Sequence, residues 1–336
     1  MYDIPHPFSL STMLICAMGF GMIAIIGVLG NFAVIMIIVL DSKHCRSVMQ
    51  TLLANLACAD LANLLATLPS IIHALTDDNF GWPVWGWQVA IFLSLSSLYA
   101  SVLLQVTICF ERYIAIVYPA HFAHVQIHCS VALSISVLWL VAGLLALPNI
   151  VLPPSHEMWF YIKIMEMLMF YIAPLIIMTI LYVHTGITLR RQARKLNRHR
   201  SIVHRPNGDR QLSRNRPLFR PNTLNSSKSN IVCMLLICVI IYYACFTPIQ
   251  VKFLYQIFRQ KRWNIPQLTN VILNGLTYAS SAANPLVYAI FLPHFRRRVK
   301  HFVCYWRMRE NPRLVPVAYD YCAPNSTYIQ HNFSYV

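Results

Sequence analysis

The sequence predicts an all-α membrane protein, a seven-transmembrane helix bundle followed by a short amphipathic eighth helix. The first observation is composition: 57% of the 336 residues are hydrophobic and only 11% are charged, whereas a soluble domain carries about 25% charged residues. The second is length, because seven apolar segments each exceed the roughly 20 residues that a helix needs to cross a bilayer. The third is charge, because basic residues gather in alternate connections between these segments.

The seven predicted spans make up a bundle over residues 12–292. The second span contains one charged residue, Asp60. The first follows a short N-terminal segment, 1–11, without a basic region, and it is too long for the apolar core of a signal peptide, so we interpret it as a span. The spans cover about 12–40, 48–75, 86–118, 128–151, 160–189, 229–258 and 266–292.

The distribution of basic residues predicts the orientation. Twelve Lys or Arg residues lie between Arg190 and Lys228, and seven lie between Arg296 and Arg313. Because basic loops stay on the cytoplasmic side, we expect a multi-pass protein of the plasma membrane with an extracellular N-terminus and a cytoplasmic C-terminus. The net charge of +16 also suggests a nucleic acid as an alternative partner. A solvated cytoplasmic loop explains the basic run 190–228 better, so no nucleic-acid partner is expected.

The chain beyond the last span predicts contacts with the membrane surface and with cytoplasmic proteins. Over 293–304, apolar residues recur at helical spacing with Arg and Lys off that stripe, which is typical of a helix lying in the membrane interface. Cys304 ends this helix and is a candidate for palmitoylation, with a plain membrane-facing thiol as the alternative. Residues 305–336 form a cytoplasmic tail that ends in Ser334-Tyr335-Val336, a candidate ligand for a PDZ domain.

The cysteines and the acidic residues argue against other functions. No cysteine lies in a predicted extracellular segment, so no extracellular disulfide is expected, and the cysteine spacings match no zinc or redox motif. The sequence shows no paired carboxylates, metal-ligand set or activated nucleophile, so we predict that the protein is not an enzyme. A seven-span transporter or channel is a further alternative, but only Asp60, Glu111 and Arg112 place charge deep inside the predicted spans.

Each predicted span carries one short motif. In order they are Gly30-Asn31; Leu56-Ala57-Cys58-Ala59-Asp60; Glu111-Arg112-Tyr113; Trp139; Pro174 with Tyr182; Cys245-Phe246-Thr247-Pro248; and Asn284-Pro285-Leu286-Val287-Tyr288. With these motifs in this order over residues 12–305, the sequence resembles the rhodopsin-like (class A) G-protein-coupled receptors. The resemblance implies a receptor that converts binding of an extracellular ligand into nucleotide exchange on a heterotrimeric G protein, with arrestin and receptor kinases as further partners.

The resemblance implies an activation switch at the cytoplasmic end of the third span. Glu111 would hold Arg112 at rest, and activation would release Arg112 toward Tyr182, Tyr288 and the G protein. The alternative is an interfacial arginine that only anchors the helix end. Prolines inside the spans would kink their helices, because proline lacks the N–H that an α-helix bonds. The residues expected in switching and coupling are Glu111, Arg112, Tyr113, Tyr182, Tyr242, Phe246, Pro248, Asn284, Pro285 and Tyr288.

Asp60 stands near the middle of the second span, where a carboxylate is costly unless it faces polar partners inside the bundle. Asn31 is one expected neighbour. In the family such a cluster can hold a sodium ion as an allosteric modulator, and a hydrated polar cluster without an ion is the alternative. No other cofactor is expected. The candidate sodium site consists of Asp60, Ser101, Ser280, Ser281 and Asn284.

Three positions depart from the family pattern. The family has a cysteine 25 residues before the switch arginine, bonded to the second extracellular loop. Here that position is Trp87, so the usual extracellular disulfide is missing. The tryptophan of the sixth span is replaced by Phe246, which carries over only part of its switching role. Ala120 stands in the second cytoplasmic loop where a bulky apolar residue is common, which leaves the choice of G protein open.

The polar residues of the outer half indicate the class of ligand. Ser94, 18 residues before Arg112, stands where amine receptors carry an aspartate, and Tyr278 stands where opsins carry their retinal-binding lysine. Glu166, in the outer part of the fifth span, either contacts the ligand or pairs with Lys163. We favour a peptide ligand, with a lipid or another non-aminergic small molecule as the alternative. The pocket candidates are Ser94, Glu166, Phe170, Phe246, Gln250, Lys252, Asn274 and Tyr278.

Overall fold

The computed structural model describes a chain of helices. The described residues are 9–40, 47–76, 82–119, 122, 128–151, 156–203, 221–259, 266–291, 295, 296 and 299, and no strand occurs among them. The long helices are α1 (Leu10–Leu40), α2 (Val48–Thr76), α3 (Val84–Val117), α5 (His128–Ala146), α8 (Ala173–Val203), α9 (Pro221–Arg259) and α10 (Gln267–Phe291). The shorter elements are α6 (Pro148–Val151), α7 (His156–Met167) and the π-helical turn η1 (Leu168–Ile172).

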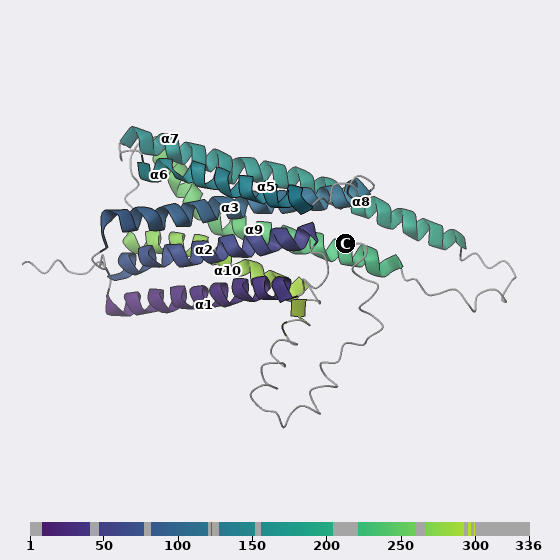
Figure 1. Cartoon of the computed structure of the whole chain (residues 1–336), viewed down its shortest axis with the longest axis horizontal. Helices are drawn as coiled ribbons and strands as arrows, with labels where there is room; N and C mark the ends of the chain where they lie inside the picture. Colours follow the sequence, from purple (N-terminus) through teal and green to yellow (C-terminus); the bar gives the residue numbers. More distant parts are fainter. Residues whose placement is uncertain are drawn as a thin grey trace, which may run out of the picture.

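The helices form a closed bundle. α7, η1 and α8 follow one another without a break and make one rod, which is the fifth long segment of the bundle. α3 packs against α2, α5 and α8, and α10 packs against α1, α2 and α9, so the ring of helices closes. Figure 1 shows the helices side by side along one axis, with α1 and α7 on opposite sides. This arrangement confirms the predicted all-α seven-helix bundle.

The surface of the bundle is apolar, and its interior holds polar groups. Ile15 on α1 is 66% exposed, whereas Asn31 on the same helix is fully buried. Six helices in the described part of the chain are long and apolar enough to cross a membrane, by length and composition. α10 is the seventh long helix, and it carries polar residues such as Ser281 and Asn284 that are buried inside the bundle. The chain is a multi-pass membrane protein.

A close approach between α1 and α10 depends on glycine. A side-chain carbon added at Gly27 would lie 2.9 Å from the Cβ of Ala282 and 2.6 Å from a methyl carbon of Leu64. The two helices are therefore near enough for Asn31 to donate hydrogen bonds from Nδ2 to the carbonyls of both Gly27 (2.9 Å) and Ser281 (3.0 Å). This contact explains why a Gly-Asn motif suits the first span.

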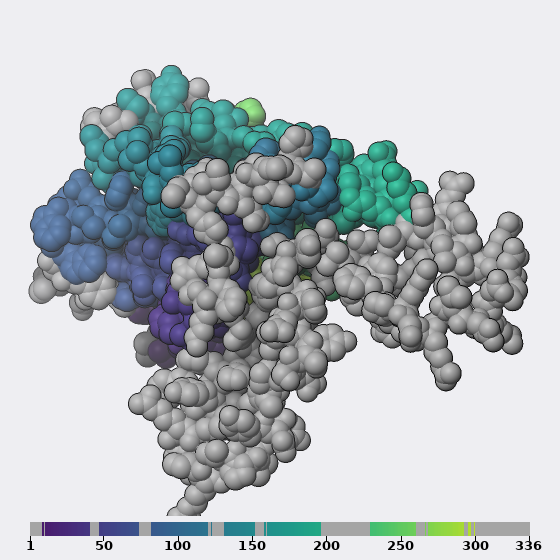
Figure 2. All heavy atoms as spheres, turned by 45° about the vertical axis from the view of Figure 1, so that its right-hand side comes forward, coloured from purple at the N-terminus to yellow at the C-terminus, as the bar shows by residue number. Residues whose placement is uncertain are grey.

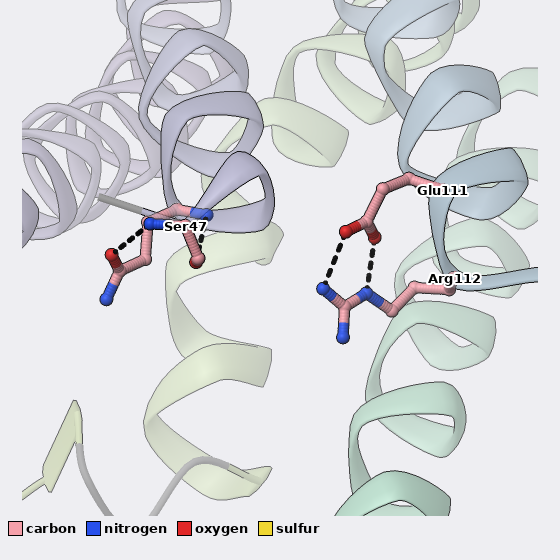
Figure 3. Close-up of polar contacts among 4 residues, drawn as sticks. Ser47, Glu111 and Arg112 are labelled. Atoms are coloured by element: carbon pink, nitrogen blue, oxygen red, sulfur yellow. Dashed lines mark hydrogen bonds and ion pairs between the residues drawn. The ribbon is translucent and has the colours of Figure 1, made fainter. Parts of the chain in front are cut away.

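Reciprocal hydrogen bonds fix the start of α2. The backbone N–H of Ser47 donates to Oε1 of Gln50 (3.1 Å), and the backbone N–H of Gln50 donates to Oγ of Ser47 (3.3 Å), which is a capping box. Figure 3 shows this cap at the same end of the bundle as Glu111 and Arg112, near the end of α3. We call this end the Arg112 end.

α8 and α9 extend beyond the hydrophobic spans predicted for them. α8 continues to Val203 and α9 begins at Pro221. The added part of α8 is rich in Arg, which is a good helix former. In Figures 1 and 2 the end of α8 projects past the rest of the bundle at the Arg112 end. In the fourth predicted span, α5 ends at Ala146 and the short α6 begins at Pro148.

Several predictions concern residues outside the described part of the chain. These are Ala120, most of the amphipathic segment 293–304 with Cys304, the tail 305–336 and its last three residues, Ser334-Tyr335-Val336. Within 293–304, Phe295 packs against the core of the bundle.

Candidate functional site

The guanidinium of Arg112 binds its chain neighbour. Arg112 Nε donates to Oε2 of Glu111 at 2.6 Å, and one terminal nitrogen donates to Oε1 at 2.9 Å, a two-point contact that Figure 3 shows. Arg112 is 7% exposed and Glu111 is 8% exposed. Two parallel charge-assisted hydrogen bonds are the geometry in which arginine and carboxylate bind best. Neither α8 nor α9 contains an Asp or Glu, so those helices offer Arg112 no competing carboxylate.

The tyrosines expected to cooperate with Arg112 lie on three helices but do not bind it. The hydroxyl of Tyr113 lies 3.1 Å from Nδ1 of His184 on α8. Tyr182, also on α8, contacts the thiol of Cys109. Tyr288 on α10 is buried, and its hydroxyl has no hydrogen-bond partner among the described residues. Among the described residues, Glu111 is therefore the hydrogen-bond partner of the Arg112 guanidinium, and the predicted tyrosines lie apart from this pair.

Asp60 joins α2 to α3 and α10. Its Oδ1 accepts a hydrogen bond from the hydroxyl of Ser101 (3.0 Å), and its Oδ2 accepts one from Nδ2 of Asn284 (2.7 Å). Asp60 is 1% exposed and forms no ion pair with a described residue. Ser281 also contacts the carboxylate, whereas the hydroxyl of Ser280 donates to the carbonyl of Thr277 (2.7 Å). Four of the five residues predicted for a sodium site thus converge.

A second polar chain links α2 to α3 and α10. Asn63 donates from Nδ2 to the hydroxyl of Ser281 (3.2 Å), and its Oδ1 accepts from the hydroxyl of Ser94 (3.1 Å). Ser94 also lies 2.8 Å from the hydroxyl of Thr67. The serine at the position of the amine-binding aspartate is therefore bonded to α2. Tyr278 is bonded to the same helix, because its hydroxyl donates to the carbonyl of Leu64 (3.0 Å).

α9 holds the irregular turn η1 with two tyrosines. The hydroxyl of Tyr242 donates to the carbonyl of Phe170 (3.2 Å), and the hydroxyl of Tyr243 donates to the carbonyl of Tyr171 (3.3 Å). Tyr242 also stacks on Phe246, with ring centroids 4.3 Å apart. π-turns interrupt the regular bonding of an α-helix and occur often at functional sites. The residue at the usual tryptophan position thus belongs to a small aromatic stack on α9.

Glu166 is the centre of a polar cluster in the half of the bundle opposite the Arg112 end. Its Oε1 accepts hydrogen bonds from the hydroxyl of Tyr99 (2.6 Å) and from Nδ2 of Asn149 (2.9 Å). Its Oε2 lies 2.7 Å from Nζ of Lys163, and both side chains are about six-sevenths buried. The ring of Tyr99 stacks flat on Phe170 with centroids 3.8 Å apart. Glu166 therefore pairs with Lys163, as one of the two sequence interpretations expected.

Two lysines meet at one aromatic ring. Nζ of Lys163 lies 5.6 Å and Nζ of Lys252 lies 5.7 Å from the centroid of Phe253, within the range of a cation–π contact. Lys252 also donates to Oδ1 of Asn270 (2.6 Å). This group brings α7, α9 and α10 together.

The predicted pocket residues thus separate into different environments. Glu166, Phe170 and Lys252 belong to the clusters built on α7, η1 and α9. Ser94 and Tyr278 each bond to α2. The remaining three are Phe246, which is buried in its stack, Gln250, which is half-buried, and Asn274, which is exposed.

Aromatic rings occupy the position of the family's outer cysteine. The ring of Trp87 lies 5.3 Å from His73 on α2 and 5.5 Å from Trp82, measured between centroids. The described cysteines Cys16, Cys58, Cys109, Cys233, Cys238 and Cys245 are free. Packing of this kind contributes stability where α2 meets α3.

Tyr99, Asn149 and Asn63 belong to these sites, although sequence reasoning did not select them. Each is a hydrogen-bonding residue in an apolar span, where leaving a polar group unpaired costs several kcal/mol of folding free energy. That cost is the signal that could have identified them. Their partners lie 67, 17 and 218 positions away in the chain, so the pairing itself depends on how the helices pack.

Comparisons with known proteins agree with this arrangement. A family model described as 7 transmembrane receptor (rhodopsin family) matches residues 30–288. Neuropeptide receptor 15 of Caenorhabditis elegans is 29% identical over 310 residues, which cover 84% of this chain and 87% of that protein. Neuromedin-U receptor 2 of Rattus norvegicus is 25% identical over 324 residues, 86% of this chain and 76% of that protein. Apelin receptor A of Xenopus laevis is 36% identical over 130 residues, 38% of this chain and 35% of that receptor.

Proposed function

The chain belongs to the rhodopsin family of seven-transmembrane receptors, and on this basis we propose that it binds an extracellular peptide and activates a heterotrimeric G protein. It is a receptor of the membrane, and the family is not a class of enzymes. The observation that carries the proposal is the buried pair of Glu111 and Arg112 at the end of α3. A charge pair at that place can hold a resting state and be released when the helices move.

A peptide ligand is supported by relatives and by the charges of the half of the bundle opposite the Arg112 end. The similar proteins are named as receptors for neuropeptides, neuromedin U and apelin. Lys163, Glu166 and Lys252 offer both signs of charge next to the rings of Phe170 and Phe253, and a peptide can engage such separate points at once. A lipid or another non-aminergic small molecule is the alternative ligand.

We place the Arg112 end in the cytoplasm, and the N-terminus outside, at the plasma membrane. The exposed basic residues Arg190, Arg191, Arg194 and Lys195 lie on α8 at this end, where Gln192 of the same helix donates to the carbonyl of Ile116 near the end of α3. Basic residues flanking a span favour the cytoplasmic side. The predicted division into residues 1–11 outside, the bundle 12–292, the surface helix 293–304 and the cytoplasmic tail 305–336 belongs to this proposal.

In the proposed mechanism, ligand binding favours a packing in which Glu111 no longer holds Arg112. The released guanidinium then lies among Tyr182 of α8 and Tyr288 of α10, whose hydroxyl has no hydrogen-bond partner among the described residues, and it contacts the C-terminal segment of the G-protein α subunit. Prolines inside α9 and α10, Pro248 and Pro285, interrupt the backbone bonding, so one end of each helix can swing while the other stays packed.

The test is a peptide panel applied to the full chain, with nucleotide exchange on each G-protein class as the readout. We expect one peptide group to stimulate exchange, and we expect Arg112→Ala to abolish the stimulation while peptide binding persists. Arg259→Ala, which removes an exposed arginine on α9, serves as the matched control. Stimulation by lipids alone would identify the alternative ligand class, and a ligand-dependent flux that survives Arg112→Ala would support a transporter.

The cluster around Asp60 fits a sodium ion, and we propose that it holds one as an allosteric modulator. Hard cations bind oxygen ligands, and Asp60, Ser101 and Ser281 place oxygens together in the core. The ion would supply the positive charge that no described side chain gives Asp60. A hydrated cluster without sodium is the alternative.

The remaining partners are proposed from the sequence of the C-terminal part. We propose that Cys304 is palmitoylated, which would attach the segment 293–304 to the bilayer. Receptor kinases and arrestin are the proposed regulators, as in the family, and Ser334-Tyr335-Val336 is the proposed PDZ ligand. Removal of Val336 should abolish capture by a PDZ domain and leave G-protein activation unchanged.

A further inference from the structure

A groove of about 690 Å³ runs between α8 and α9 on the outside of the bundle. On α8 its lining extends from Leu175 to Arg190, and on α9 it extends from Leu236 to Thr247. The lining residues recur at intervals of three and four on each helix, so a single face of each helix forms one wall. At 1.5 Å per residue, the α8 wall is about 22 Å long.

The groove is hollow because small residues line it. A side-chain carbon added at Gly186 would meet nothing within 4 Å, and a second small residue, Ala244, lines the groove on α9. Two hydroxyl groups in the lining already have protein partners: Tyr243 donates to the carbonyl of Tyr171 (3.3 Å), and Thr247 donates to the carbonyl of Tyr243 (2.6 Å). These two hydroxyls therefore need no hydrogen bond from a molecule that binds in the groove.

The position of the groove indicates that an apolar chain binds in it. Val183 and Ile240 in its lining are 57% and 56% exposed, and in a membrane-spanning bundle such a surface faces lipid. One leaflet of the hydrocarbon core is about 15 Å deep, so a groove about 22 Å long reaches from the middle of the membrane to the headgroups.

The charge at one end of the groove indicates the headgroup. Arg190 is exposed, lines the Arg112 end of the groove and forms no ion pair with a described residue. A guanidinium binds phosphate through two parallel hydrogen bonds. Thr179 lies at the depth of the acyl chains and carries no charge. Arg190 is the one charged residue among the described residues that line the groove, so the positive charge lies only where a headgroup would bind.

We propose that this groove binds one anionic phospholipid of the membrane leaflet at the Arg112 end. One acyl chain lies along Gly186 between α8 and α9, and the phosphate binds Arg190. The assignment requires only that the bundle spans a membrane, so it stands or falls independently of the ligand and the G protein. Because α8 and α9 share few direct contacts, the bound lipid would also contribute to the packing between them.

The test uses the purified full chain in nanodiscs that contain phosphatidylcholine with a small fraction of phosphatidylserine carrying a photoreactive acyl chain. Mass spectrometry of the labelled peptides locates the lipid. We expect labels on the groove residues of α8 and α9. Gly186→Phe, which fills the open space, should lower this labelling at least about fivefold, because the acyl chain loses its apolar contact there. Gly21→Phe is the matched control, because a side-chain carbon at Gly21 on α1 also meets nothing within 4 Å.

Arg190→Gln tests the headgroup separately. It should reduce the preference for phosphatidylserine over a photoreactive phosphatidylcholine by about fivefold, while Arg191→Gln, one residue along α8, should leave the preference unchanged. Gly186→Leu accompanies Gly186→Phe, so that a defect of folding in the larger variant does not decide the result. Labelling that ignores both Gly186 variants, equal labelling by both phospholipids in the unaltered protein, or displacement of the probe by a sterol would overturn the proposal.

Discussion

The hydroxyl of Tyr242 on α9 donates a hydrogen bond to the backbone carbonyl of Phe170 in η1, over 3.2 Å. Pro174, four residues after Phe170, has no N–H, so it cannot give this carbonyl the bond that an α-helix would require. The tyrosine supplies a donor from a different helix, at the place where the fifth rod changes from π-helix to α-helix. A local irregularity in one helix is thereby tied to the position of α9.

Removing this hydroxyl should loosen the described arrangement. Tyr242→Phe leaves a buried carbonyl without its α9 donor, and we expect a loss of about 1–3 kcal/mol in the free energy of unfolding. Thermal unfolding of the purified protein measures the effect. Tyr161→Phe removes a hydroxyl from a side chain that is 70% exposed and should cost close to nothing. Equal effects of the two changes would contradict the interpretation.

The ion pair at the end of α3 predicts the basal activity of a variant. Glu111→Gln removes the charge that holds Arg112, and since α8 and α9 contain no acidic residue, no carboxylate on those helices replaces it. We expect nucleotide exchange without ligand to rise about tenfold, which corresponds to about 1.4 kcal/mol.

Glu111→Asp is the control, because it keeps the negative charge and should stay near the unaltered basal rate. The measurement is G-protein nucleotide exchange at equal receptor density. A folded Glu111→Gln variant with unchanged basal exchange would show that the pair only anchors the helix end.

The contact between α1 and α10 predicts a steric effect at one glycine. Gly27→Leu forces atoms against the Cβ of Ala282 and against Leu64, and overpacking of this kind costs about 1–3 kcal/mol. Gly19→Leu adds the same atoms where a side-chain carbon meets nothing within 4 Å. The thermal midpoint of the first variant should fall, and that of the second should not. Similar midpoints would mean that α1 can shift to relieve the contact.

The Asp60 cluster predicts a difference between sodium and potassium. A ligand that binds only the folded protein raises its stability, so NaCl should raise the thermal midpoint of the unaltered chain above the value in KCl at equal concentration. Asp60→Asn should remove this difference, and Ser101→Ala should reduce it.

Ser280→Ala separates the two predicted serines, because the Ser280 hydroxyl donates to the carbonyl of Thr277 on its own helix. We expect this variant to keep the full sodium effect. An unaltered protein with equal midpoints in the two salts would favour the hydrated cluster without an ion.

The sequence by itself determined that the chain is a bundle of seven apolar helices and that Arg112 stands beside Glu111 near the end of the third one. These properties are local. Hydropathy depends on consecutive residues, and a short motif such as Glu111-Arg112-Tyr113 is complete within one helix. The family could therefore be identified from residues that need no knowledge of how the helices pack.

The tertiary structure alone decided which polar side chains meet. Ser94 and Tyr278 are predicted to face a ligand, and the structure shows that each also bonds to α2. Glu166 gathers Tyr99 from α3 and Asn149 from α6. The physical reason is that a polar side chain in an apolar span must find a partner, and the rotation and separation of the helices determine which one it reaches. The same packing leaves the groove beside Gly186, and no local sequence pattern predicts that groove.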